Sequence, residues 1–193
     1  VNDAPIAENE SYLGYNEDEV LVIDYEMGVL TNDYDADVLG EPDTLDGGPD
    51  DQVLEAVLVT NVLHGTLFSD DSLTEEITVN TGFDGHFYYK PDSNYYGADQ
   101  FVYVADDNYE QSNYDTVRIG LIPINDAPEL DIDDQETNEE VPLTITVLGT
   151  DVDAGSGPGD ENVLSYSAVS LNPDSLAVTM TGDQLTMTPV QEY

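Results

Sequence analysis

The sequence predicts an all-β protein made of two tandem antiparallel β-sandwiches. Apolar and polar residues alternate with a period of two in short runs, as where Val117, Ile119 and Leu121 alternate with Arg118 and other residues. Asp-Gly and Gly-Asp pairs at 84–85 and 182–183 are typical of tight hairpin turns between such runs. No window of helical length has a 3.6-residue apolar period. Many short strands with tight turns favour the sandwich class.

The individual strands are predicted from runs rich in Val, Ile, Leu, Tyr and Thr that are bounded by Gly, Pro, Asn or Asp. In the first part of the chain these runs are 20–23, 53–60, 77–79, 86–89, 100–105 and 116–124. In the second part they are 143–147, 164–169, 177–180 and 184–188.

An internal repeat indicates where one domain ends and the next begins. Asn-Asp-Ala-Pro at 2–5 recurs at 125–128, and Asp33-Tyr34-Asp35 is matched by Asp-Val-Asp at 151–153. The offset between matched motifs shrinks along the chain, which indicates insertions in the first copy, chiefly an acidic loop near 41–52. We therefore predict one domain over 1–124 and a second over 125–193. The second is predicted to be incomplete at its C-terminus, because it has no counterparts of the runs 100–105 and 116–124.

The charge balance excludes some partners and demands an explanation. Only Lys90 and Arg118 oppose 43 Asp and Glu residues among the 193, so the formal net charge is -41. Such a chain cannot neutralise phosphates, which argues against nucleic acid and against anionic membranes as partners. Carboxylate repulsion can be tolerated through disorder, adaptation to high salt, or binding of multivalent cations. The regular β-type runs disfavour disorder.

Cysteine is absent, so disulfides, thiolate metal sites and cysteine nucleophiles are excluded. No run approaches the length of a membrane span, and no signal peptide is present, so we expect an internal segment of a longer protein. No nucleophile motif, phosphate loop or zinc signature occurs, and the two histidines are interpreted as structural. The sequence therefore predicts that the chain is not an enzyme.

Closely spaced carboxylates in loops are the pattern that calcium sites leave in a sequence, because Ca²⁺ takes six to eight oxygen ligands. Asp33 and Asp35 have this spacing, and so do Asp151 and Asp153 at the matching position of the second copy. The recurrence at one repeat position makes calcium the predicted cofactor.

The ordered set of motifs resembles the cadherin-like and bacterial immunoglobulin-like tandem repeats of large secreted adhesins of the RTX type. The motifs are Asn-Asp-Ala-Pro, Glu17-Asp18, the Asp-x-Asp pair, His-Gly-Thr-Leu at 64–67, the run 84–89 and the run 96–101. The resemblance covers nearly the whole chain. It implies immunoglobulin-like sandwiches that bind calcium at the junction of successive domains and act as a rigid spacer in cell adhesion, secreted or on the cell surface.

By the same resemblance, particular residues are expected to ligate calcium. Glu17 and Asp99 would serve from the base of the first domain, Asn125 and Asp126 from the linker, and Asp151 and Asp153 from the second domain. A matching half-site toward a preceding repeat would comprise Asn2, Asp3, Asp33 and Asp35. One ligand toward a following repeat would be Glu139.

The residues leave alternatives open. Solvated loop carboxylates and linker turns explain the same Asp and Asn residues without a metal. Some tyrosines are candidates for stacking on sugar rings, namely Tyr95, Tyr96, Tyr109 and Tyr114. The alternative function is therefore a module that binds carbohydrate or a cell surface. Such a module could be accessory to a secreted enzyme or free-standing. The expected partners are neighbouring repeats of the same polypeptide. A polysaccharide or other cell-surface ligand, and strand swapping through the second domain, also remain open.

Overall fold

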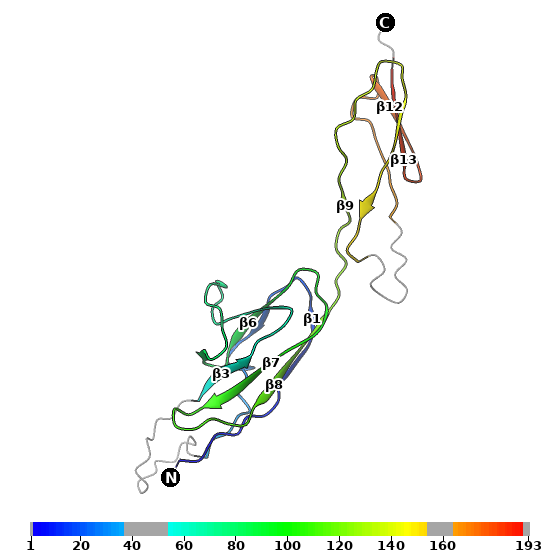
Figure 1. Ribbon diagram of the computed structural model, residues 1–193. Helices are drawn as coiled ribbons and strands as arrows, with labels where there is room; N and C mark the ends of the chain where they lie inside the picture. The colour runs from blue at the N-terminus through cyan, green and yellow to red at the C-terminus, as the bar shows by residue number, and fades with distance from the viewer. Residues whose placement is uncertain (1, 37–53, 154–163, 191–193) are drawn as a thin grey trace. The chain divides into compact units, whose positions relative to one another are not determined.

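The computed structural model describes residues 2–36, 54–153 and 164–190, so the acidic insertion predicted near 41–52 lies outside the described residues. It contains strands and no helix within those ranges, which confirms the predicted all-β class. The chain divides into two compact units, Val1–Ile124 and Asn125–Tyr193, described separately below. Figure 1 shows the strands of each unit.

Two sheets build the first unit. The larger has the strand order β1-β8-β7-β3-β5 and the smaller has the order β2-β6-β4. The larger sheet comprises β1 (Ser11–Asn16), β8 (Asp115–Ile122), β7 (Gly97–Asp106), β3 (Glu55–Thr60) and β5 (Gly82–Phe83). The smaller comprises β2 (Leu21–Ile23), β6 (Phe87–Pro91) and β4 (Gly65–Phe68).

Most neighbouring strands are antiparallel, but β1 runs parallel to β8, with Ser11 opposite Arg118 and Tyr12 opposite Ile119. The register shifts between Leu13 and Tyr15, where Gly14 has a φ of 83°. This is the left-handed region, which glycine enters at little cost. Beyond the bulge, β1 continues along β8 as far as the pair of Asn16 and Ile122.

The core lies between the two sheets, because both contribute alternate side chains to it. Phe101 and Val117 of the larger sheet are fully buried, as are Ile23 and Phe87 of the smaller. The ring of Phe87 meets Tyr12 and Phe101 edge to face, with centroids 5.6 and 5.3 Å apart. These contacts join the two sheets, as expected for a sandwich.

The predicted run 77–79 is not a strand, although its apolar pattern is real. Ile77 is 1% exposed, and its backbone amide donates a hydrogen bond to the carbonyl of Leu67. Only Glu76 forms an isolated bridge, with Phe68. Burial of one side chain therefore produced the sequence signal without a continuous ladder.

The second unit contains a three-stranded sheet of order β10-β13-β12 and a two-stranded pair, β11-β9. Its apolar side chains divide between half-buried and exposed positions, Leu148, Val169 and Leu171 being 71%, 84% and 99% exposed, and Val147 is buried. The predicted run 164–169 forms no strand, yet its side chains still alternate between half-buried and exposed. The strands are β9 (Glu129–Leu130), β10 (Leu143–Thr146), β11 (Gly149–Thr150), β12 (Leu176–Thr181) and β13 (Gln184–Pro189).

Candidate metal centres

Glu17 follows β1 and has a buried carboxylate at one end of the first unit. Its side chain is 1% exposed, and Oε1 accepts a hydrogen bond from the backbone amide of Ile124 at 2.9 Å. Oε2 is buried and has no hydrogen-bond partner within the described part of the chain. A buried carboxylate oxygen without a donor is costly, so this atom fits a ligand for a cation.

Asp99, predicted to ligate the same ion, has a different environment. Its Oδ1 accepts the backbone amides of Leu63 and Gln100 at 3.0 and 2.8 Å. Its Oδ2 accepts the amide of His64 and the hydroxyl of Tyr89, both at 2.9 Å. The Tyr89 hydroxyl also lies 2.9 Å from the His64 carbonyl, so its single hydrogen is shared between that carbonyl and Asp99. A carboxylate offers about four acceptor sites, and the three backbone amides occupy most of them. Any cation would have to compete with these hydrogen bonds.

The Asn-Asp-Ala-Pro segment and the Asp-x-Asp loop of the first unit lie side by side. Ile6 and Tyr34 exchange two backbone hydrogen bonds of 2.7 and 2.9 Å, which place residues 2–5 near Asp33 and Asp35. Asp33 Oδ1 accepts the amide of Glu8 at 3.0 Å, and Asp35 is 3% exposed. Asp3 is exposed. The bridge between these segments was not evident from the sequence spacing.

Asn2 lies against Asp107, which is not among the predicted ligands. Its side-chain amide donates to Asp107 Oδ2 at 3.0 Å, while Asp107 Oδ1 accepts the amides of Tyr109 and Glu110. Asp107 is fully buried, and burial is outweighed by the hydrogen bonds from Glu110, Asn2 and Tyr109, so the pKa of its carboxyl is lowered. Asp107 is therefore held as a carboxylate beside the first segment of the chain.

The second unit repeats the contact between the two motifs. The backbone amide of Asp126 donates to Asp153 Oδ2, and the amide of Asp153 donates to Asp151 Oδ1 at 3.0 Å. Asp153 is 9% exposed, whereas Asn125 is exposed and donates its side-chain amide to the Asp126 carbonyl. Four of the predicted ligands of this unit thus lie in one linked group.

Glu139, the ligand predicted to face a following repeat, is exposed in the turn before β10.

Two carboxylates that the sequence did not select lie at the edge of the first core. Glu10 is 8% exposed and Asp115 is 3% exposed, and both occupy inward-facing positions two residues before Tyr12 and Val117. Burial, together with repulsion from Asp33 and Asp115, raises the pKa of Glu10 to about 8. Burial raises the pKa of Asp33 to about 6, although the Glu8 amide opposes this. The sequence signal that could have identified these two residues is an acid at a core-facing position of an alternating strand.

Within residues 2–36, 54–153 and 164–190, no three Asp, Glu or His side chains converge closely enough to hold a metal by themselves. Ca²⁺ also accepts backbone carbonyls, amide oxygens and water as ligands. The buried oxygen of Glu17 and the linked group around Asp153 have the hard oxygen chemistry that this ion requires.

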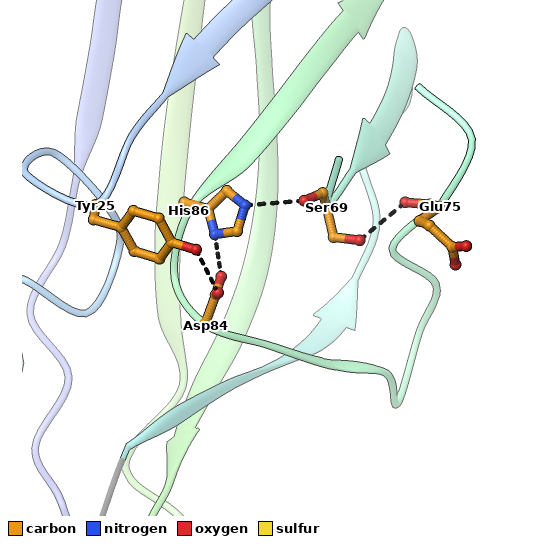
Figure 2. A network of polar contacts seen from close by, with 5 residues as sticks. All are labelled: Tyr25, Ser69, Glu75, Asp84 and His86. Carbon is orange, nitrogen blue, oxygen red and sulfur yellow. Dashed lines mark hydrogen bonds and ion pairs between the residues drawn. The ribbon is translucent and has the colours of Figure 1, made fainter. Parts of the chain in front are cut away.

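Figure 2 shows the surroundings of His86, which the sequence interpretation assigned a structural role. Its Nδ1 forms an ion pair with Asp84, its Nε2 lies 2.9 Å from the Ser69 carbonyl, and Tyr25 donates to Asp84 at 3.0 Å. The hydroxyl of Ser69 donates to the carbonyl of Glu75, so it does not face the imidazole. The cluster joins three segments and presents no serine activated by histidine.

Comparisons with known proteins bear on the fold. The family model described as a bacterial Ig domain matches residues 2–120, more than half of the chain. No curated protein matches the chain. A solved endo-fucoidan hydrolase of glycoside hydrolase family 107 aligns with 97% of this chain at 15% identity and a TM-score of 0.37, and the chain spans 24% of that enzyme. A similarity of this size carries no argument about activity.

No helix long and apolar enough to cross a membrane occurs among the described residues.

Proposed function

Because the chain belongs to the bacterial Ig domain family, we propose that it is a calcium-binding structural repeat of an extracellular bacterial adhesin. Domains of this family are typically extracellular or displayed on the surface, and they serve as structural or binding modules. In the proposed role the chain is a spacer without a catalytic site, and its direct partners are neighbouring repeats of the same polypeptide.

The observation that carries the calcium proposal is the buried, unpartnered Oε2 of Glu17. Leaving a charged acceptor buried without a donor costs at least about 1–3 kcal/mol. Glu17 is bonded through its other oxygen to Ile124, directly before the Asn125-Asp126 pair. A calcium ion at Glu17 would offset that cost and occupy the position that the resemblance to cadherin-like repeats assigns to it.

Charge supports the same proposal. A chain with a net charge of -41 is opposed in its compact state by repulsion among its carboxylates. Bound Ca²⁺ removes this repulsion locally, and it stabilises the folded state because the unfolded chain has no preformed sites. Calcium would therefore stiffen the segments that contribute ligands.

Isothermal titration of calcium into chelator-treated protein tests the proposal. We expect saturable binding in the wild type and the loss of about one bound ion in Glu17→Gln, which removes the charge but keeps the shape. Glu26→Gln is the matched control, because Glu26 is exposed and its side chain is not near Glu17 in any observed contact. Equal calcium stoichiometry in the wild type and Glu17→Gln would refute the role of Glu17.

A sugar-binding module is the second candidate, favoured by exposed aromatic rings on the first unit. Tyr25, Tyr109 and Tyr114 are 65%, 61% and 74% exposed. Exposed rings of this kind can stack on pyranose faces, whereas the buried tyrosines of the core cannot. Specific, saturable binding on a glycan array, lost in Tyr109→Ala and Tyr114→Ala, would favour this function over a simple spacer.

A further inference from the structure

The strongest unexplained feature outside the predicted ligands is the pair of buried carboxylates Glu10 and Asp115. They come from neighbouring strands of one sheet: the carbonyl of Glu10 accepts the amide of Arg118 at 3.0 Å, and β1 and β8 are paired. Asp115 lies directly opposite Tyr103 in the register of β7 and β8. Strand pairing therefore forces two acids and a tyrosine into one corner of the core.

The oxygens of this corner outnumber the hydrogens available to them. The hydroxyl of Tyr103 lies 2.8 Å from the Val29 carbonyl, 2.9 Å from Asp33 Oδ2 and 3.4 Å from Glu10 Oε2. A tyrosine hydroxyl has one hydrogen to donate, so it can satisfy one of these three acceptors fully. When the acids are ionised, the remaining acceptors receive no hydrogen from this hydroxyl.

Two further oxygens, Glu10 Oε1 and Asp115 Oδ2, accept no hydrogen bond from any donor in the described chain, although their residues are more than nine-tenths buried. The side chains of Glu10 and Asp115 neighbour each other, and a hydrogen bond between these two carboxyls requires a proton on one of them. No lysine or arginine in the described ranges is within ion-pair distance of Glu10, Asp33 or Asp115. The side-chain amide of Asn32 is the neutral donor that reaches Glu10. With its acids ionised, the corner thus has excess negative charge and open acceptor positions.

We propose that Glu10 and Asp115 bind a cation, most suitably Ca²⁺, within the first unit. The two carboxylates supply the charge, and neutral oxygens such as the Val29 carbonyl and water complete the shell. Asp33, whose Oδ2 lies 2.9 Å from the Tyr103 hydroxyl, adds negative charge near Glu10. Calcium suits such a corner better than Mg²⁺, because Mg²⁺ gives up its water reluctantly. This site goes beyond the proposed function, because it uses neither Glu17 nor the second unit.

Repulsion among the carboxylates of this corner is reduced either by a bound cation or by protonation. When no cation is bound, burial and the neighbouring carboxylates keep the pKa of Glu10 well above its ordinary value. Replacing both acids by their amides removes the repulsion and the binding site together. The two effects have opposite signs in chelator and in calcium, which makes the proposal testable.

The test compares E10Q/D115N with wild type by thermal melting in chelator and in millimolar calcium, and by calcium titration calorimetry. We expect the double variant to melt at or above the wild-type temperature in chelator. We also expect it to bind one calcium ion fewer and to lose more than half of the calcium-induced rise in melting temperature. E26Q/D92N, which removes two exposed charges, should keep the wild-type stoichiometry.

The proposal would be overturned if E10Q/D115N kept both the wild-type calcium stoichiometry and the wild-type calcium-induced rise in melting temperature. Protonation alone would then reduce the repulsion among the buried carboxylates. Should the double variant fail to fold, D115N decides by the same two measurements. The outcome is separable from that for Glu17: E17Q should retain the ion at Glu10 and Asp115, and E10Q/D115N should retain the ion at Glu17.

Discussion

The carboxylate of Asp99 fixes three segments of the first unit to one another. It accepts backbone amides from the loop at Leu63 and His64, another from Gln100 in β7, and the hydroxyl of Tyr89 in β6. The acid is 5% exposed, so these hydrogen bonds are shielded from water. Hydrogen bonds to a charged group are stronger than neutral ones, and the role of Asp99 is therefore structural whether or not calcium is present.

We predict that Asp99→Asn lowers the free energy of unfolding by about 3 kcal/mol, because the amide nitrogen would face donors in place of an acceptor. Urea denaturation followed by circular dichroism measures the change. Asp92→Asn, which removes the same charge from an exposed residue, should alter the free energy by less than about 0.5 kcal/mol. Equal midpoints for the two variants would show that the hydrogen bonds to Asp99 contribute little.

At the scale of residues, the sequence identified acids by motif and missed acids placed by strand register. Asp33 and Asp153 belong to the recurring Asp-x-Asp pattern, so they could be selected as candidate ligands from spacing alone. Glu10 and Asp115 belong to no recurring motif, and their burial depends on the pairing of β1 with β8. The charge environment of Asp99 was equally out of reach, because its donors come from segments far apart in the sequence.

At the scale of elements, period-two alternation predicted burial more reliably than it predicted ladders. The run 116–124 overlaps β8, whose side chains alternate between buried and partly exposed. Side chains also alternate over 164–169, but no strand forms there. Alternation reports which side chains face inward, whereas a ladder also requires a partner strand in register. Short elements such as β5 give almost no periodic signal, so they were missed.

Two glycines with a positive φ, one in each unit, allow the stability of each unit to be tested separately. Gly14 has a φ of 83° at the bulge of β1, and Gly182 has a φ of 60° at the first position of the two-residue turn between β12 and β13. A Cβ at either position meets nothing within 4 Å, so the cost of a side chain is conformational. For an L-residue that cost is about 1–2 kcal/mol.

We therefore predict that Gly14→Ala weakens hydrogen-exchange protection in β1 and β8 by about 1–2 kcal/mol, while the amides of β12 and β13 keep theirs. Gly182→Ala, the matched control, should give the reverse pattern. Exchange measured by mass spectrometry at peptide resolution distinguishes the two variants. Loss of protection in both units from either substitution would mean that the units unfold together.

At the scale of the whole molecule, negative charge acts on stability in two ways that salt can separate. Repulsion among exposed carboxylates is spread over a chain of net charge -41, and it is screened at 1 M salt, where the Debye length is about 3 Å. The buried corner of Glu10, Asp33 and Asp115 is screened much less, because water and ions do not enter it freely. A pH titration in chelator at 1 M sodium chloride therefore isolates the corner.

Under those conditions we predict that stability falls as the pH rises from about 4 to about 8. Burial raises the pKa of Glu10 from 4.5 to about 8 and that of Asp33 from 3.8 to about 6. The folded state therefore keeps protons that the unfolded state has released, so the stabilisation is complete below the unfolded values and is lost as pH rises through the folded ones. Each pKa unit corresponds to about 1.4 kcal/mol.

Urea midpoints measured at intervals from pH 4 to pH 8 provide the measurement, and Glu10→Gln provides the control. The amide does not titrate, so the slope above pH 6, where Glu10 is the group that still loses its proton, should largely disappear in the variant. A slope that is equal in the wild type and Glu10→Gln would assign the pH dependence to other carboxylates. In saturating calcium the wild-type slope should also flatten, because a cation in the corner replaces the proton that the folded state would otherwise retain.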